Sequence, residues 1–292
     1  MVQFLESQFP ESLDMHVESV GLPLQSASEH NELVEYLLEK RYNSPLPYHA
    51  FLQDDQIENK DPIISCIALT HKCKEDENGR LLSHLVFGAT RDVKLLRRMV
   101  FYPYHISSLQ DRNGWLALHY AMYNKASTEI TEYMMERNPE HVRVSDIHGI
   151  SPLHVACQCG CSLEKIKILV NDKQDLLQMR DGRGRLPLHA ACEGQTSLDA
   201  VEYLVDGNEG NLTVQDDCGE LPLHKSCRVG NLSLINYLVE RDMRSVSTRN
   251  HKNELPVFLL CNRLHKNRDM LESFGYTEII YKLILAHPET VS

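Results

Sequence analysis

The stretch DIHGISPLHVA (residues 146–156) contains features that recur along the chain at a fixed spacing. Its histidine belongs to a series in which each member follows the previous one by 35 residues: His84, His119, His154, His189 and His224. The same spacing leads back to His49 in LPYH, and LPVF places Phe258 at this position 34 residues after the last histidine. A period of roughly 20 to 50 residues is typical of stacked structural repeats. The sequence therefore predicts an array of similar units.

Two further series keep the same register. An aspartate precedes a glycine by three residues in the pairs Asp76 and Gly79, Asp111 and Gly114, Asp146 and Gly149, Asp181 and Gly184, and Asp216 and Gly219, and Asn250 and Asn253 continue the series. A small residue stands two positions after each of four histidines: Ala121, Ala156, Ala191 and Ser226. Aspartate favours tight turns because it bonds to the backbone, and glycine accepts a positive φ. We therefore expect a tight turn at the start of each unit.

The residues after each turn predict two helices. The proline of LPLH lacks a backbone N–H and fixes φ, which suits the first turn of a helix, so a short helix is expected from Pro187 to about Glu193. In the segments SLEKIKILV, SLDAVEYLV and NLSLINYLV, apolar residues recur at i, i+3, i+6 and i+7, which predicts a second helix with one apolar face. The apolar positions are Leu163, Ile166, Leu169, Val170, Leu198, Val201, Leu204, Val205, Leu232, Ile235, Leu238 and Val239.

A turn, a short helix, a second turn and a longer helix within about 35 residues resemble the ankyrin repeat, whose D-x-x-G-x-T-P-L-H-x-A signature is matched by DIHGISPLHVA. The resemblance implies an all-α ankyrin-repeat solenoid of about seven stacked helix-turn-helix units with the turn tips on one edge. It also implies that the histidines of the series bond to backbone near the turns. Two features depart from the family. Leu116, Leu186 and Leu221 replace its threonine, and the unit is longer than the consensus of about 33 residues.

The repeat register divides the chain into four parts. We expect an N-terminal leader or cap in residues 1–20, degenerate repeats in 21–75, regular ankyrin repeats in 76–261, and a degenerate C-terminal repeat and cap in 262–292. Segments 22–27 and 32–40 are interpreted as a helix pair, and the apolar run 63–69 as a further helix. Residues 265–275 are interpreted as an insertion before a last helix over 276–287. Terminal repeats are expected to be atypical because one of their faces meets water.

Charge and composition narrow the classes of partner and compartment. The chain has 30 Lys and Arg against 41 Asp and Glu, a net charge of -11, which disfavours nucleic acid and anionic lipid as partners. No window reaches the roughly 18 consecutive apolar residues of a membrane helix, and the first residues carry acids where a targeting peptide carries bases. Nine cysteines without framework spacing fit a reducing compartment. We expect a cytoplasmic or nuclear protein that is a monomer.

Histidines and cysteines at these positions are interpreted as scaffold. A residue that recurs once per unit serves the unit, and histidines about 10 Å apart cannot share a metal whose ligands lie within roughly 2.0 to 2.1 Å. Cys157, Cys192 and Cys227 also recur every 35 residues and are predicted to be buried. The phosphate-loop, dinucleotide, zinc-protease and nucleophile-elbow motifs do not occur, so the sequence predicts neither an enzyme nor a cofactor nor a metal site.

The predicted function is a non-catalytic scaffold or adaptor that binds a protein or peptide on the concave face of the array. The candidate binding residues lie between the aspartate and the glycine or directly after the glycine: Arg112, Asn113, Trp115, Ile147, His148, Ile150, Arg183, Arg185, Asp217, Glu220, His251 and Lys252. Their charge changes sign between repeats, which favours a partner of mixed, ordered charge. Two alternatives stay open. One is redox or metal sensing through Cys157, Cys159 and Cys161, and the other is a regulatory or substrate-recruiting subunit of a larger enzyme complex.

The position after the glycine holds the only tryptophan of the chain, Trp115. Elsewhere this position is filled by Arg80, Ile150, Arg185, Glu220 and Glu254. Because it accepts both signs of charge, we expect it to be exposed. Trp115 either covers the neighbouring tip or anchors a partner, with Tyr123 or Arg112 as support, since tryptophan is enriched among interface hot spots.

Overall fold

The computed structural model describes His84 and residues 110–194, 196–266 and 274–285. The helices expected over 22–40 and 63–69, and the turn expected at Asp76, lie outside these residues. The described residues form ten α-helices and four short 3-10 helices, with no β-strand among them. The all-α prediction is confirmed. The chain divides into two compact units, Met1–His141 and Val142–Ser292, and each is described by itself.

Apart from His84, the described part of the first unit is one turn with its helix pair. Asp111 and Gly114 form the turn, and α7 (Ala117–Tyr123) and α8 (Thr128–Arg137) follow it. Ser127 caps α8, because its side chain accepts a hydrogen bond from the Ile130 N–H. The 3-10 helix η2 (Pro139–Arg143) continues from this pair into the second unit.

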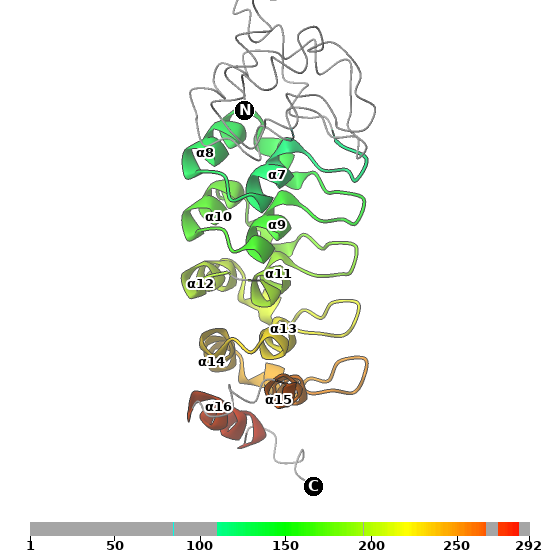
Figure 1. The fold of residues 1–292 in the computed structure, drawn as a ribbon, viewed down its shortest axis with the longest axis vertical. Helices are drawn as coiled ribbons and strands as arrows, with labels where there is room; N and C mark the ends of the chain where they lie inside the picture. The colour runs from blue at the N-terminus through cyan, green and yellow to red at the C-terminus, as the bar shows by residue number, and fades with distance from the viewer. Residues whose placement is uncertain (1–83, 85–109, 195, 267–273, 286–292) are drawn as a thin grey trace, which may run out of the picture. The chain divides into compact units, whose positions relative to one another are not determined.

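The second unit is a stack of four helix pairs. The pairs are α9 (Pro152–Cys159) with α10 (Leu163–Val170), α11 (Pro187–Glu193) with α12 (Leu198–Gly207), α13 (Pro222–Val229) with α14 (Leu232–Arg241), and α15 (Pro256–Lys266) with α16 (Phe274–Leu285). Figure 1 shows the first helix of each pair in one column and the second helix in another, with the turn tips beside the first column. We call α9, α11, α13 and α15 the inner helices and their partners the outer helices. The 3-10 helices η3 (Gln174–Gln178), η4 (Glu209–Thr213) and η5 (Met243–Ser247) follow the first three outer helices.

The turns form as the aspartate and glycine series predict. Asp181 Oδ1 accepts hydrogen bonds from the N–H groups of Arg183 and Arg185, both at 2.9 Å, and Gly184 has a φ of +69°. In the last turn the neutral Asn250 has the same role, since its Oδ1 accepts from two N–H groups at 3.0 and 2.9 Å. Asn253 replaces the glycine there with a φ of 64°. One acceptor oxygen is therefore enough to close the turn.

Backbone hydrogen bonds join successive tips of the second unit. The N–H of Gly182 donates to His148 O at 2.7 Å, and the N–H of Asp217 donates to Arg183 O at 3.0 Å. The N–H of His251 continues the series by donating to Cys218 O at 2.9 Å. These bonds fix the spacing of the tips, so the side chains on them are held in register.

The helices agree closely with the sequence pattern. The helix expected from Pro187 to about Glu193 has those bounds. The last three apolar positions of each second helix are buried, whereas the first, Leu163, Leu198 or Leu232, is half-buried because it begins the helix. The last helix starts at Phe274, two residues earlier than expected, and residues 286–287 are outside the described part. Five helix pairs are described, and the count of about seven units stays a prediction.

The helices in the described part of the chain are all too short or too polar to cross a membrane.

Candidate functional site

The recurring histidines connect neighbouring repeats of the second unit. The His189 ring is 0% exposed, its Nδ1 accepts a hydrogen bond from the Leu186 N–H at 3.1 Å, and its Nε2 lies 3.1 Å from Glu220 O in the next turn. Because Nδ1 accepts, the proton is on Nε2, which donates to that carbonyl. Burial lowers the pKa of His189 to about 4, so the ring is neutral at pH 7.

His154 and His224 also reach a backbone carbonyl in the next turn. His154 reaches Arg185 O at 3.1 Å and His224 reaches Glu254 O at 3.4 Å, and burial lowers the pKa of both rings. In the first unit His119 accepts from the Leu116 N–H at 3.0 Å. His84 and His119 are both fully buried. The series is therefore part of the scaffold and offers no accessible imidazole.

The cysteines of the inner helices are buried thiols. Cys157, Cys192 and Cys227 are each 0% exposed, and burial raises the pKa of the Cys192 thiol to about 12. Burial likewise raises the pKa of Cys157, and Cys161 beside it is also buried. A thiolate is the form that binds metals and reacts with oxidants, so the buried Cys157 and Cys161 are poorly suited to either role, whereas Cys159 between them is half-buried. Among the described residues no three potential ligands are grouped so as to hold a metal ion.

The two residues between the aspartate and the glycine are exposed in every described turn. Arg112 and Asn113 are exposed in the first unit. In the second unit the exposed candidate residues are Ile147, His148, Arg183, Asp217, His251 and Lys252, and Ile147 is 65% exposed. In the second unit the second of these two residues takes part in the turn through its backbone. The N–H groups of Arg183 and Lys252, for example, donate to Asp181 and Asn250. Different side chains are thus presented on one repeated backbone.

A family model of ankyrin repeats (3 copies) matches residues 84–180 and 166–250, together more than half of the chain. The chain belongs to the ankyrin repeat family. Proteins of this family are generally non-catalytic and generally act as protein-protein interaction modules. No curated protein matches the chain.

We expected the residue after the glycine to be exposed, but in two repeats of the ankyrin scaffold its side chain is buried. Arg185 is 8% exposed and Glu220 is 2% exposed. Arg185 pairs with Asp181 at 2.8 Å in its own turn and with Glu193 at 2.8 Å on α11. Burial acts to raise the pKa of Asp181, but backbone N–H groups and the Arg185 guanidinium outweigh it and lower that pKa. Ile150 is half-buried.

In the next turn Glu220 pairs with Lys225 Nζ at 2.8 Å and with Arg228, both on α13. Lys225 is also buried and pairs with Asp216 at 2.8 Å. Burial acts to lower the pKa of Lys225, but the two carboxylates outweigh it and raise that pKa. The expectation of exposure is therefore wrong for Arg185 and Glu220. Each side chain lies along its own inner helix and pairs there with a residue of opposite charge. Arg185 pairs with Glu193, eight positions later, and Glu220 pairs with Lys225 and Arg228, five and eight positions later.

The Trp115 side chain also lies along its own helix, α7, where its neighbours are aromatic instead of charged. Its ring lies edge-on to Tyr120 at 4.9 Å and to Tyr123 at 5.8 Å between centroids, again five and eight positions later. Trp115 is half-buried, Tyr123 is 58% exposed, and the Tyr120 hydroxyl donates to Asp111 at 2.7 Å. Sequence reasoning missed Tyr120 and the buried Lys225. Both could have been found from the sequence, because the residues five and eight positions after the one that follows the glycine are complementary to it: aromatic for Trp115 and cationic for Glu220.

Proposed function

We propose that this ankyrin array is a non-catalytic adaptor that binds a protein segment along its turn tips and inner helices, which together we call the tip face. The observation that carries the proposal is the contrast within each turn. The aspartate or asparagine fixes the same backbone each time, whereas the exposed side chains change from Ile147 and His148 to Arg183, Asp217 and Lys252. A constant frame with variable exposed residues is suited to recognition.

The contacts beneath the tips support this role because they hold the tip face rigid before a partner binds. Arg185 links its turn to α11, and Lys225 links the following turn to α13. A surface that is already ordered loses less conformational entropy on binding. In the first unit the exposed Tyr123, supported by Trp115, offers a large amphipathic ring of the kind that anchors interfaces. A role as the recruiting subunit of a larger complex would use the same surface.

Photo-crosslinking tests the location of the binding surface. We would replace Ile147, which is 65% exposed at a tip, with benzoylphenylalanine, and in a matched variant replace Ile168 on the outer helix α10. In extracts of cells that express the protein, the Ile147 variant should form covalent adducts with a partner and the Ile168 variant should not. Adducts at Ile168 alone, or equally at both positions, would place the binding surface elsewhere.

The adduct then supplies the partner for a binding measurement. Tyr123→Ala should weaken binding by more than tenfold, because truncating an interface hot spot costs about 2 kcal/mol or more. Trp115→Ala should do the same, since its ring supports Tyr123. Tyr203→Ala on the outer helix α12 is the control and should leave the affinity within about twofold. Unchanged affinity in the two aromatic variants would remove this patch from the interface.

A further inference from the structure

The tips of the second unit present charges in a fixed order. Each turn has two exposed positions, and the second of them holds His148, Arg183, Cys218 and Lys252 in successive repeats. Two cations are therefore separated by one turn that has a neutral residue at this position. The hydrogen bonds between neighbouring tips fix this order in space.

The first exposed position adds a carboxylate between the two cations. A Cβ atom on Gly184 would lie 2.4 Å from the Asp217 carboxylate, so the Asp217 side chain rests against the preceding tip. The His251 ring lies in the same way against Gly219, where a Cβ atom would be 2.6 Å from its Cδ2. The side chains of Asp217 and His251 thus lie in the spaces between their own tips and the preceding ones. Along the edge, an approaching segment meets Arg183, then Asp217, then Lys252.

The buried carboxylates beneath the tips do not change the order of charges that a bound segment would contact. Asp181 is buried and already accepts from two backbone N–H groups and from Arg185. Asp216 and Glu220 are buried against Lys225. Among the described tips and inner helices of residues 142–266, Asp217 is the one fully exposed carboxylate, whereas Glu193 and Glu254 are half-buried and bond to Arg185 and Asn250. The net charge of the chain, -11, therefore does not describe what a ligand meets on this edge.

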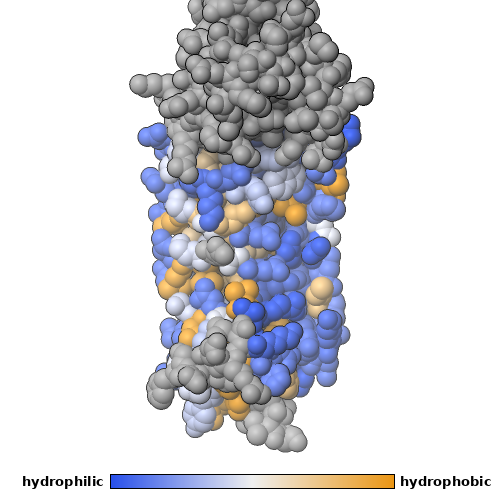
Figure 2. Space-filling model, viewed as in Figure 1, coloured by the Kyte–Doolittle hydropathy of each residue, from blue (hydrophilic) through white to orange (hydrophobic). Residues whose placement is uncertain are grey.

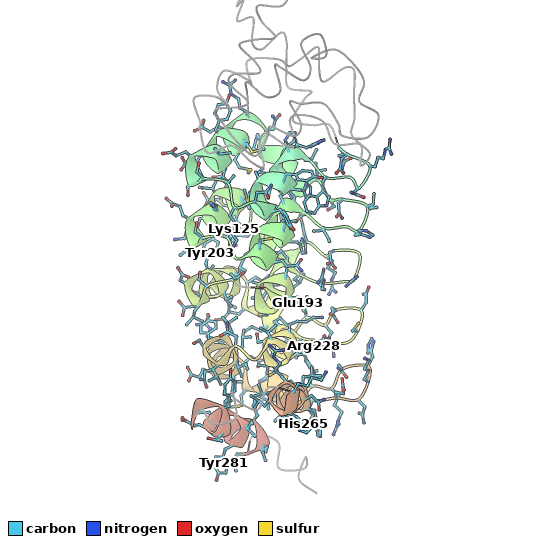
Figure 3. All side chains as sticks on the ribbon, viewed as in Figure 1. Lys125, Glu193, Tyr203, Arg228, His265 and Tyr281 are labelled. Atoms are coloured by element: carbon cyan, nitrogen blue, oxygen red, sulfur yellow. The ribbon has the colours of Figure 1, made fainter. Side chains whose placement is uncertain are left out.

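The surface over the tips is also polar. Figure 2 shows mainly hydrophilic side chains on the side of the second unit where Figure 1 draws the tips, whereas apolar residues gather toward the outer helices. Figure 3 labels Glu193 and Arg228 on the inner helices α11 and α13, and both engage in the ion pairs of the turns. Recognition along this edge consequently depends on charge more than on apolar burial.

We propose that the tip edge from Arg183 to Lys252 binds an extended protein segment that has two acidic residues separated by about six positions, with a basic residue midway between them. The two cations are two repeats apart, about 16 to 20 Å if stacked helices are about 8 to 10 Å apart. An extended chain advances about 3.3 Å per residue, so five or six residues span that distance. Asp217 selects the basic residue in the middle and disfavours a uniform polyanion. This inference deepens the proposed function and rests on it.

Peptides with defined charge order test the proposal on the full chain. The matched probe is GSEGSKGSEGS, and the reversed probe is GSKGSEGSKGS. Exposed ion pairs contribute about 1.4- to fivefold each, and the reversed probe replaces three attractions with three repulsions. The matched peptide should therefore bind at least about sevenfold more tightly, with amide shifts in NMR spectra at residues 182–184, 217–219 and 251–253. Equal binding of the two peptides, or shifts confined to other residues, would overturn the proposed charge order.

Charge variants make the test specific to these side chains. Arg183→Asp combined with Lys252→Asp should abolish the preference for the matched peptide, whereas Asp217→Arg should transfer it to GSEGSEGSEGS. The control Arg244→Asp changes an exposed cation in η5, outside the tip face, and should leave the preference unchanged. An equal loss in Arg244→Asp would mean that only the net charge matters.

A twelve-nucleotide oligouridine separates a protein ligand from a nucleic acid. It should bind more weakly than the matched peptide, and tighter binding of the oligouridine to the tip edge would overturn the proposal. Failure of the charge order is distinguishable from failure of the proposed function. Adducts at Ile147 together with equal binding of both peptides would leave the binding surface in place and remove only the inferred partner chemistry.

Discussion

Replacing His189 with alanine tests whether the recurring histidines hold successive repeats together. The ring is completely buried and bonds at both nitrogens, to the Leu186 N–H in its own repeat and to Glu220 O in the next. His189→Ala therefore leaves both of these backbone groups without their partner and leaves a cavity between α11 and α13. The damage should be concentrated at one junction between repeats.

The expected loss of stability is large for a single substitution. Each buried backbone group left without a partner costs about 1 to 3 kcal/mol, and the lost packing of the ring adds a cavity term. Relaxation around the cavity recovers part of this, so we expect a loss of about 3 to 5 kcal/mol. Domain stabilities are about 5 to 15 kcal/mol, so the variant should lose much of its stability margin.

Urea unfolding of the full chain, followed by circular dichroism, measures this loss. Amide exchange then locates it, because an array need not unfold in one step, and protection should fall first in α11 and α13. His148→Ala, at an exposed tip position, is the matched control and should change stability by about 0.5 kcal/mol or less. If His189→Ala lost under 1 kcal/mol, or lost no more than the control, the histidine series would not be structural.

Four further predictions follow from the same contacts. The pKa of His189 is about 4 when folded and 6.5 when unfolded, so stability should be complete above pH 6.5 and fall by up to roughly 3 kcal/mol as the pH drops to 4, and a flat urea midpoint over this range would contradict it. Lys225→Met removes the cation that the buried Asp216 and Glu220 share and leaves Glu220 with Arg228, so it should cost about 3 kcal/mol by urea unfolding, whereas parental stability would mean that the pairs are dispensable. Iodoacetamide should label the exposed Cys218 in the native protein and spare Cys192 until unfolding, as mass mapping would show, and equal labelling would be inconsistent with the burial. Asn250→Asp should lower stability by about 1 to 2 kcal/mol although it restores the aspartate of the other turns, and a gain in the urea midpoint would refute this.

The repeat itself was predictable because its contacts occur once per unit. A turn that needs one acceptor and one residue with positive φ leaves an aspartate and a glycine at constant spacing, and a neutral buried ring between repeats leaves a histidine. The short helix from Pro187 to Glu193 followed from the proline at its first turn. These contacts are local or join equivalent positions, so a periodic sequence reports them directly.

The direction of the side chain after the glycine was not predictable from a single position. Arg185, Glu220 and Trp115 have different charges, and variation of this kind also occurs at solvent-exposed positions. The structure shows that each is matched by its own helix: Arg185 by Glu193, and Glu220 by Lys225. The variation is therefore compensated inside the repeat. Only comparison of positions five and eight residues apart, after the helix register is known, reveals it.

The same compensation explains why the last turn uses asparagine. The turn needs only the first side-chain oxygen, and in Asp181 and Asp216 the second oxygen accepts from a cation, Arg185 or Lys225, each at 2.8 Å. In the last turn the atom at this place is Asn250 Nδ2, which donates to Glu254 Oε2 at 3.0 Å. An aspartate there would bring two carboxylates together, whereas an amide supplies the donor that the glutamate needs. In these three turns the first residue thus makes two contacts that determine its type, a constant one to the backbone and a variable one to a side chain of its own repeat.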